Sequence, residues 1–273
     1  MSRSIRASRL GLYAGVALLA VLAVLAAFGP DLTGHDPLFV DLAGRFAAPF
    51  GSEHLLGTDQ LGRDLLARVL RGLRWSLGVA LCATLLAFAI GTTLGLVAAR
   101  SRSLAGRIIR QVTAFAQSFP VFVLAVSLIA IVGNGFGALV TILGLVTWPV
   151  FCRVVQAEAA SLLTREYVLA ARMLQMSTLR LYTRHVLPGI LASLSVLVPF
   201  HFADMLIAES ALSFLGIGAP LGIATWGNML QESRSYLVTA PWLMLVPAVA
   251  IISLVFAANL FGDGLRRRLG VST

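Results

Sequence analysis

Residues 77–99 read LGVALCATLLAFAIGTTLGLVAA and contain no charged side chain over 23 positions. An α-helix rises about 1.5 Å per residue, so about 20 apolar residues cross a hydrocarbon layer of about 30 Å. Five further apolar runs of similar length are separated by polar stretches; they cover residues 10–28, 112–132, 136–152, 189–215 and 242–261. The sequence therefore predicts an all-α, polytopic membrane protein whose six transmembrane helices contact lipid.

The composition of the 273-residue chain excludes a water-soluble enzyme. Hydrophobic residues make up 58% of the chain and charged residues 12%, with a mean hydropathy of +0.90, whereas soluble domains have about 25% charged residues. The first apolar run exceeds the roughly 7–15 residues of a signal peptide, which favours an uncleaved anchor. We expect a single transmembrane domain over residues 1–273. Within it, residues 1–76 form the anchor helix and an extracytoplasmic loop, and residues 77–262 form the core.

Every basic residue is an arginine, and with 12 acidic residues the 21 arginines give a net charge of +9. A P-loop needs a lysine to hold phosphates, so this chain cannot bind ATP in that manner. The arginines interrupt apolar segments and do not gather on one soluble face, which argues against a nucleic-acid partner.

The distribution of the arginines predicts the orientation, because basic residues near the ends of spans favour the cytoplasmic side. With the N-terminus inside, 15 arginines fall on the cytoplasmic side and 6 outside. The outside arginines are Arg45, Arg63, Arg68, Arg71, Arg74 and Arg234. This imbalance predicts that both termini are cytoplasmic.

The longer outer connection covers residues 29–76. Apolar residues spaced by three or four positions after residue 64 predict an amphipathic helix, with Thr58 or Asp59 as its N-cap. We expect this helix to lie along the membrane surface before the second span. It is either a structural lead-in to that span or a contact for a substrate or partner.

The longer inner connection covers residues 153–188. Its stretch 165–174 reads REYVLAARML and favours a helix. This helix is too polar to enter lipid and carries an apolar stripe. It therefore either binds a protein partner or packs on its own chain.

Three motifs carry a resemblance to a known family. Glu166-Tyr167-Val168 through Ala170-Ala171-Arg172 to Pro188 resembles the EAA loop of permeases of binding-protein-dependent ABC importers. The stretches 54–64 with 74–77 and 208–218 with 226–227 resemble the C-type permease of the dipeptide, oligopeptide and nickel branch. The resemblance implies a type I, MetI-like permease fold and a multi-pass protein of a prokaryotic inner (plasma) membrane.

The resemblance also implies the partners and the activity. The chain would form half of the translocation path for di- or oligopeptides, beside a second, B-type permease, two ABC ATPase subunits and an extracytoplasmic solute-binding protein. ATP and Mg²⁺ would bind the ATPase subunits, so this chain is expected to be no enzyme and to hold no cofactor or metal. Import of nickel, another metal chelate or opines by the same architecture is the alternative.

The resemblance assigns coupling to the ATPase to segment 156–188. The residues it implicates are Glu166, Tyr167, Ala170, Ala171, Arg172, Leu174, Gln175 and Ser177. The family usually has Gly at the position of Gln175. Because Gln lacks glycine's easy access to positive φ, either the helix runs on further or its turn is strained. With a straighter helix end, Gln175→Gly is expected to cost little activity.

His201, Asp204 and Glu209 are ionisable residues within the fifth span, which makes them candidates for the translocation path. At about 100° per residue the two carboxylates diverge by about 140° around the helix. Five residues also separate them by about 7.5 Å of rise, so one metal ion can hardly bind all three. We expect Asp204 to face the bundle interior or an aqueous path and Glu209 to form hydrogen bonds near the outer mouth.

These ionisable residues leave a proton-coupled secondary transporter as an alternative of a different class. Such transporters often contain inverted repeats, and none is visible in this sequence. A membrane-embedded enzyme is less supported still, because no His-Glu-x-x-His or comparable ligand set occurs.

Overall fold

The computed structural model describes residues 2–51, 54–100, 103–220 and 222–270. Long helices dominate this part of the chain, as the sequence predicts. They are α1 (Ser2–Leu32), α2 (Leu65–Ala98), α3 (Leu104–Ala116), α4 (Val121–Val132), α5 (Phe136–Leu162), α6 (Glu166–Met173), α7 (Thr178–Leu181), α8 (Leu187–Phe214), α9 (Trp226–Ser233) and α10 (Trp242–Leu269). Short helical turns, η1 (Leu42–Gly44), η2 (Tyr182–Val186) and η3 (Arg234–Tyr236), lie between them.

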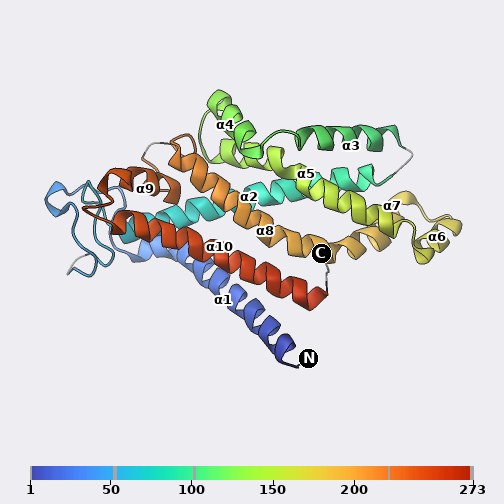
Figure 1. Cartoon of the computed structure of the whole chain (residues 1–273), viewed down its shortest axis with the longest axis horizontal. Helices are drawn as coiled ribbons and strands as arrows, with labels where there is room; N and C mark the ends of the chain where they lie inside the picture. Colours follow the sequence, from blue (N-terminus) through green and yellow to red (C-terminus); the bar gives the residue numbers. More distant parts are fainter. Residues whose placement is uncertain (1, 52–53, 101–102, 221, 271–273) are drawn as a thin grey trace.

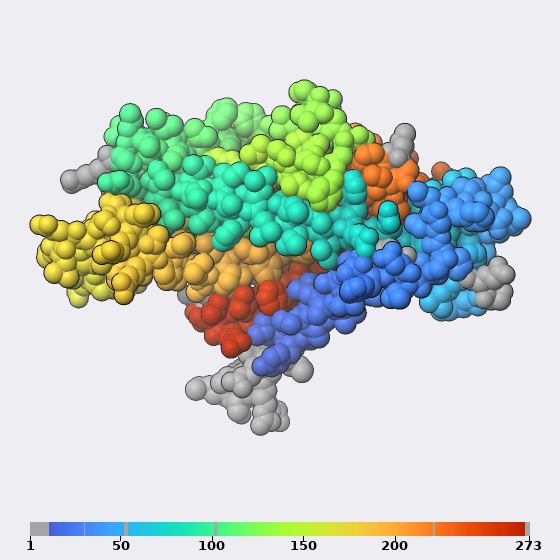
Figure 2. Space-filling model, turned by 180° about the vertical axis from the view of Figure 1, so that it is seen from behind, coloured from blue at the N-terminus to red at the C-terminus, as the bar shows by residue number. Residues whose placement is uncertain are grey.

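The helices run lengthwise and place the polar connections at two opposite ends (Figure 1). One end, here called the α9 end, carries α9 and the loop 33–64. The other, the α6 end, carries α6 and α7. The N-terminal end of α1 and the C-terminal end of α10 point toward this α6 end. Figure 2 shows the same two ends from behind. The structure thus separates the two connections that the sequence places on opposite sides of the membrane.

Five helical segments of the described chain are long and apolar enough to cross a membrane. A sixth crossing requires α3 and α4 together, which are bent by 90°. The prediction of one continuous helix over 112–132 is therefore wrong. Pro120 has no backbone N–H and disfavours a helical conformation at the preceding residue, so the helix breaks between Ala116 and Val121.

The prediction that a separate helix lies along the membrane surface before the second span is also wrong. Residue 65 begins a single 34-residue helix, α2, whose N-cap is Asp64, with its carboxylate accepting a hydrogen bond from the N–H of Ala67 at 2.7 Å. Thr58 is not available as a cap, since its hydroxyl accepts from the N–H of Ala47 at 2.8 Å. Leu65 and Leu73 are buried in the core, so the apolar stripe faces protein and not lipid.

Small residues allow the long helices to approach closely. A Cβ built on Gly91 of α2 would lie 2.5 Å from the carbonyl oxygen of Trp148 on α5. On the other side of the bundle, a Cβ on Gly15 of α1 would lie 2.6 Å from the backbone nitrogen of Phe261 on α10. Membrane helices associate by such packing, because lipid supplies no hydrophobic force between them.

The first turns of α2 are fastened to α9 at the α9 end. The indole N–H of Trp226 donates to the carbonyl of Val69 at 3.0 Å, and the Trp226 side chain is fully buried. A Cβ on Gly72 would collide with this indole at 2.9 Å. The contact holds the first residue of α9 against the first turns of α2.

Candidate functional site

The segment at the α6 end is a short amphipathic helix. Val168 and Ala171 are buried in a cluster with Ala99, Ala159 and Leu163. The other predicted coupling residues are exposed; they are Glu166, Tyr167, Ala170, Arg172, Leu174, Gln175 and Ser177. Two large apolar side chains, Met173 and Leu174, are 85% and 82% exposed. The helix therefore packs on its own chain through one face and presents apolar surface on the other.

Gln175 adopts the left-handed conformation, with φ of 55°. The helix ends in a Schellman motif, in which the N–H of Met176 donates to Ala171 O at 3.3 Å and that of Gln175 to Arg172 O at 2.9 Å. The structure therefore has the strained turn and not the longer helix. The shape of the turn is the one that a glycine favours.

We expect Gln175→Gly to stabilise this turn, because a non-glycine residue in the left-handed region costs about 1–2 kcal/mol. Amide hydrogen exchange of α6 should slow, and transport should be retained. Gln175→Val, with a β-branched side chain at the same φ, should instead accelerate the exchange. Faster exchange in the glycine variant would contradict this assignment of strain.

His201 and Asp204 line one hollow of about 320 Å³ between α4, α5 and α8. Asp204 is exposed, whereas His201 is 3% exposed, with its ring 4.7 Å from that of Phe151. The Nδ1 atom of His201 lies 3.3 Å from the hydroxyl of Thr84, and Nε2 has no partner in the part of the chain that the structure describes. An exposed carboxylate in a membrane span needs water or a polar partner, which keeps Asp204 a candidate for the translocation path.

Glu209 is on the same helix but outside this hollow. Its side chain is fully buried and accepts hydrogen bonds from the hydroxyls of Ser213 at 2.9 Å and Ser210 at 3.5 Å. The structure thus brings together two of the three ionisable residues and separates the third. No group of three His, Cys, Asp or Glu side chains suited to a metal occurs among the described residues.

A second hollow, of about 340 Å³, contains a functional candidate that the sequence analysis missed. Arg153, interpreted there as part of the inner connection, lies within α5 and donates to the amide oxygen of Gln117 at 3.0 Å. The two hollows share no lining residue, so they are separate sites. We call the first one, which Asp204 lines, the membrane groove. The available signal was Gln117 within one predicted apolar run and Gln156 four residues after the end of another.

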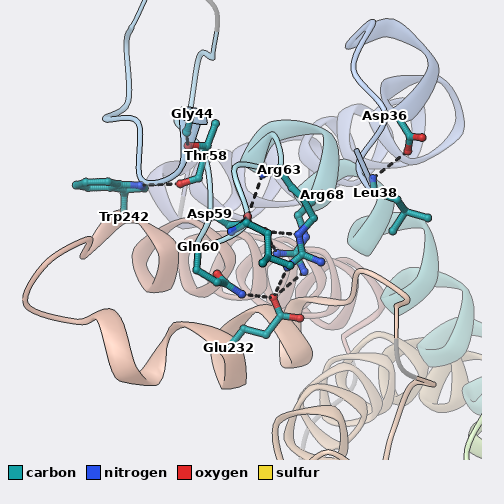
Figure 3. Close-up of polar contacts among 11 residues, drawn as sticks. Asp36, Leu38, Gly44, Thr58, Asp59, Gln60, Arg63, Arg68, Glu232 and Trp242 are labelled. Atoms are coloured by element: carbon teal, nitrogen blue, oxygen red, sulfur yellow. Dashed lines mark hydrogen bonds and ion pairs between the residues drawn. The ribbon is translucent and has the colours of Figure 1, made fainter. Parts of the chain in front are cut away.

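An ionic cluster joins the loop to α9 at the α9 end (Figure 3). The carboxylate of Asp59 receives hydrogen bonds from the guanidinium groups of Arg63, at 2.6 Å, and Arg68. Both arginines also donate to Oε2 of Glu232, at 2.9 and 3.0 Å, and Gln60 donates to the same oxygen at 3.0 Å. Arg68 is 3% exposed and Asp59 1%, so these charges depend on one another for compensation.

A bundle of membrane-crossing helices, a groove with a charged side chain between them and a protruding amphipathic helix define a multi-pass membrane transport protein. The family described as "Binding-protein-dependent transport system inner membrane component" matches residues 91–271, and the chain belongs to this family. The predicted family is thus confirmed, and the secondary-transporter alternative is not favoured.

Two relatives and one solved structure resemble the chain over most of its length. A Brucella suis protein named for a peptide transport system permease is 40% identical over 92% of this chain and 84% of its own. The "Dipeptide transport system permease protein DppC" of Alkalihalophilus pseudofirmus is 33% identical over 93% and 84%. A chain of the MetNI methionine ABC transporter, in inward-facing conformations, covers 74% of this chain and 95% of its own at 19% identity and a TM-score of 0.62. This last likeness confirms the predicted fold.

Proposed function

We propose that the chain is a permease subunit of an ABC importer for di- and oligopeptides, and that it acts as a single transmembrane domain. The observation that carries this proposal is its identity of 33–40% with permeases named for peptide and dipeptide transport over more than nine tenths of its length. The membrane groove supports it, because the carboxylate of Asp204 suits a substrate with an ammonium group.

The importer would contain a second permease, two ATPase subunits and a solute-binding protein. ATP and Mg²⁺ would bind the ATPase subunits, and this chain would hold no cofactor. To test the proposal, the assembled importer is placed in proteoliposomes and uptake of a labelled dipeptide is measured. We expect uptake to require both ATP and the binding protein. Uptake driven by a proton gradient without ATP would refute it.

We propose that the α6 end and both termini are cytoplasmic. The predicted excess of arginines on this side supports the orientation. A green fluorescent protein fused after residue 273 should fluoresce, because this reporter does not fold after export in the unfolded state. An alkaline phosphatase fusion at the same position should be inactive. The reverse pattern would overturn the orientation.

The exposed face of α6 would dock on an ATPase subunit. We expect Glu166→Ala to leave assembly intact and to lower peptide-stimulated ATP hydrolysis, because the charge and the first turn of α6 are part of the proposed contact. Leu174→Ala, which removes an exposed apolar side chain at the end of α6, should act in the same direction. Arg107→Ala, an exposed arginine of α3 outside segment 156–188, is the control. Normal stimulated hydrolysis and uptake in both α6 variants would contradict the coupling role.

A further inference from the structure

A third hollow, of about 560 Å³, lies at the α6 end, where the ends of α2 and α5 meet α6 and α7. It shares no lining residue with the membrane groove or the second hollow. Its inner surface includes the buried apolar residues Ala99, Leu163 and Leu181. Polar side chains complete the lining; they are Arg100, Thr164, Arg172, Thr178 and Tyr182. The hollow therefore suits a molecule with one apolar and one polar part.

The two arginines of this hollow are free to bind a ligand. Among the described residues, no side chain or carbonyl accepts a hydrogen bond from the guanidinium of Arg100 or Arg172, and neither forms an ion pair. Two other arginines, by contrast, donate hydrogen bonds to backbone carbonyl groups near the ends of helices. Arg110 donates to the carbonyl of Ala98 at 2.6 Å, and Arg74 donates to that of Ala26 at 2.9 Å.

The charge of the hollow is uncompensated. None of its described lining residues is acidic, although two are arginines. A phenolic hydroxyl, that of Tyr182, belongs to the same lining and can donate a further hydrogen bond. Two guanidinium groups and a hydroxyl form a donor set suited to a phosphate group.

The position of the hollow indicates the source of the phosphate. The neighbouring helices α2 and α5 are both long enough to cross the membrane, and they end at Ala98 and Leu162. On α2 the apolar run ends at Ala99 and the charged Arg100 follows, and both residues line the hollow, which places it next to the end of the apolar part of this span. Basic pockets between membrane helices are known to bind anionic lipid headgroups.

We propose that this hollow binds an anionic phospholipid, with Arg100 and Arg172 holding its phosphate and the apolar residues contacting its glycerol and acyl region. Arg172 belongs to α6, and Arg100 follows the end of α2. One headgroup thus joins the α6 segment to the spans. The lipid would limit how far α6 moves relative to α2.

The test compares lipids on the assembled importer by native mass spectrometry after exchange into nanodiscs of phosphatidylglycerol or phosphatidylcholine. Wild type is expected to retain one phosphatidylglycerol per copy of this chain and not to retain phosphatidylcholine. The double variant Arg100→Gln/Arg172→Gln should lower retention at least about tenfold, since charged hydrogen bonds contribute that much or more. Arg107→Gln removes an exposed arginine from α3 outside the hollow, and should retain the lipid.

Tyr182→Phe keeps the ring and removes only the hydroxyl donor, so it tests the site even if the double variant fails to assemble. It should weaken retention several-fold. Equal retention in wild type and Tyr182→Phe, or an equal loss in Arg107→Gln, would overturn the proposal. Displacement of the lipid by inorganic phosphate at equal concentration would assign the site to a free anion instead. Retention only after removal of the ATPase subunits would assign it to an acidic group of that partner, which also overturns the proposal.

Discussion

Arg68→Met is expected to destabilise the α9 end by about 3–5 kcal/mol, which is the usual cost of removing one partner from a buried ion pair. Asp59 would lose the cation that it shares with Glu232 and would keep only Arg63. The free energy of local opening, measured by amide hydrogen exchange over 55–70 and 226–236, should fall by this amount. Uptake should fall with it, because the ion pair of Arg68 with Glu232 joins α2 to α9.

Two controls separate the loss of charge balance from the loss of side-chain packing. Arg71→Met removes an exposed arginine one turn further along α2 and should leave exchange unchanged. After Arg68→Met one cation, Arg63, faces two carboxylates; adding Glu232→Gln leaves Arg63 paired with Asp59, so this double variant should recover part of the lost stability. If the double variant opens as readily as Arg68→Met alone, packing and not charge compensation explains the effect.

Asp204→Asn is expected to lower peptide uptake about 10- to 100-fold, because a hydrogen bond to a charged group contributes about 1.5–3 kcal/mol. The carboxylate lines the membrane groove and has no protein cation in the part of the chain described here. It is therefore available to a substrate ammonium. Asp204→Glu keeps the charge and should retain most uptake, whereas unchanged uptake in the Asn variant would exclude Asp204 from the path.

Glu209→Gln provides the contrast on the same helix. Its carboxyl group is buried and bonded to two serine hydroxyls, so we expect weaker assembly and not a selective loss of uptake. Neither variant should change metal binding by the purified chain. A stoichiometric nickel or zinc ion that is lost in either variant would overturn this separation of roles.

The course of the chain through the membrane was largely predictable. Predicted runs that begin at residues 136, 189 and 242 correspond to helices that begin at Phe136, Leu187 and Trp242. Bilayer thickness sets the minimum length of an apolar run, so the run itself marks the helix. Helix ends were less predictable, because α5 and α10 continue into polar sequence once water or protein can solvate their side chains.

Breaks and junctions depended on contacts that the apolar pattern does not encode. The run 112–132 hides the bend at Pro120, since both sides of the bend are apolar. The turn at Gln175 takes the left-handed conformation although its residue type disfavours it. Its Schellman hydrogen bonds and the packing of Ala171 and Met176 offset the local strain.

By itself the sequence determined the membrane location, the number of apolar runs, the family motifs and the exclusion of P-loop ATP binding. Each follows from residue identity or from spacing along the chain. Only the tertiary structure decided that Arg68 meets Glu232, 164 positions away, and that Arg153 meets Gln117 in the second hollow. It also decided that Arg100 and Arg172 line one hollow. Such pairings arise because packed helices bring distant side chains together, and helix periodicity alone does not specify which helices become neighbours.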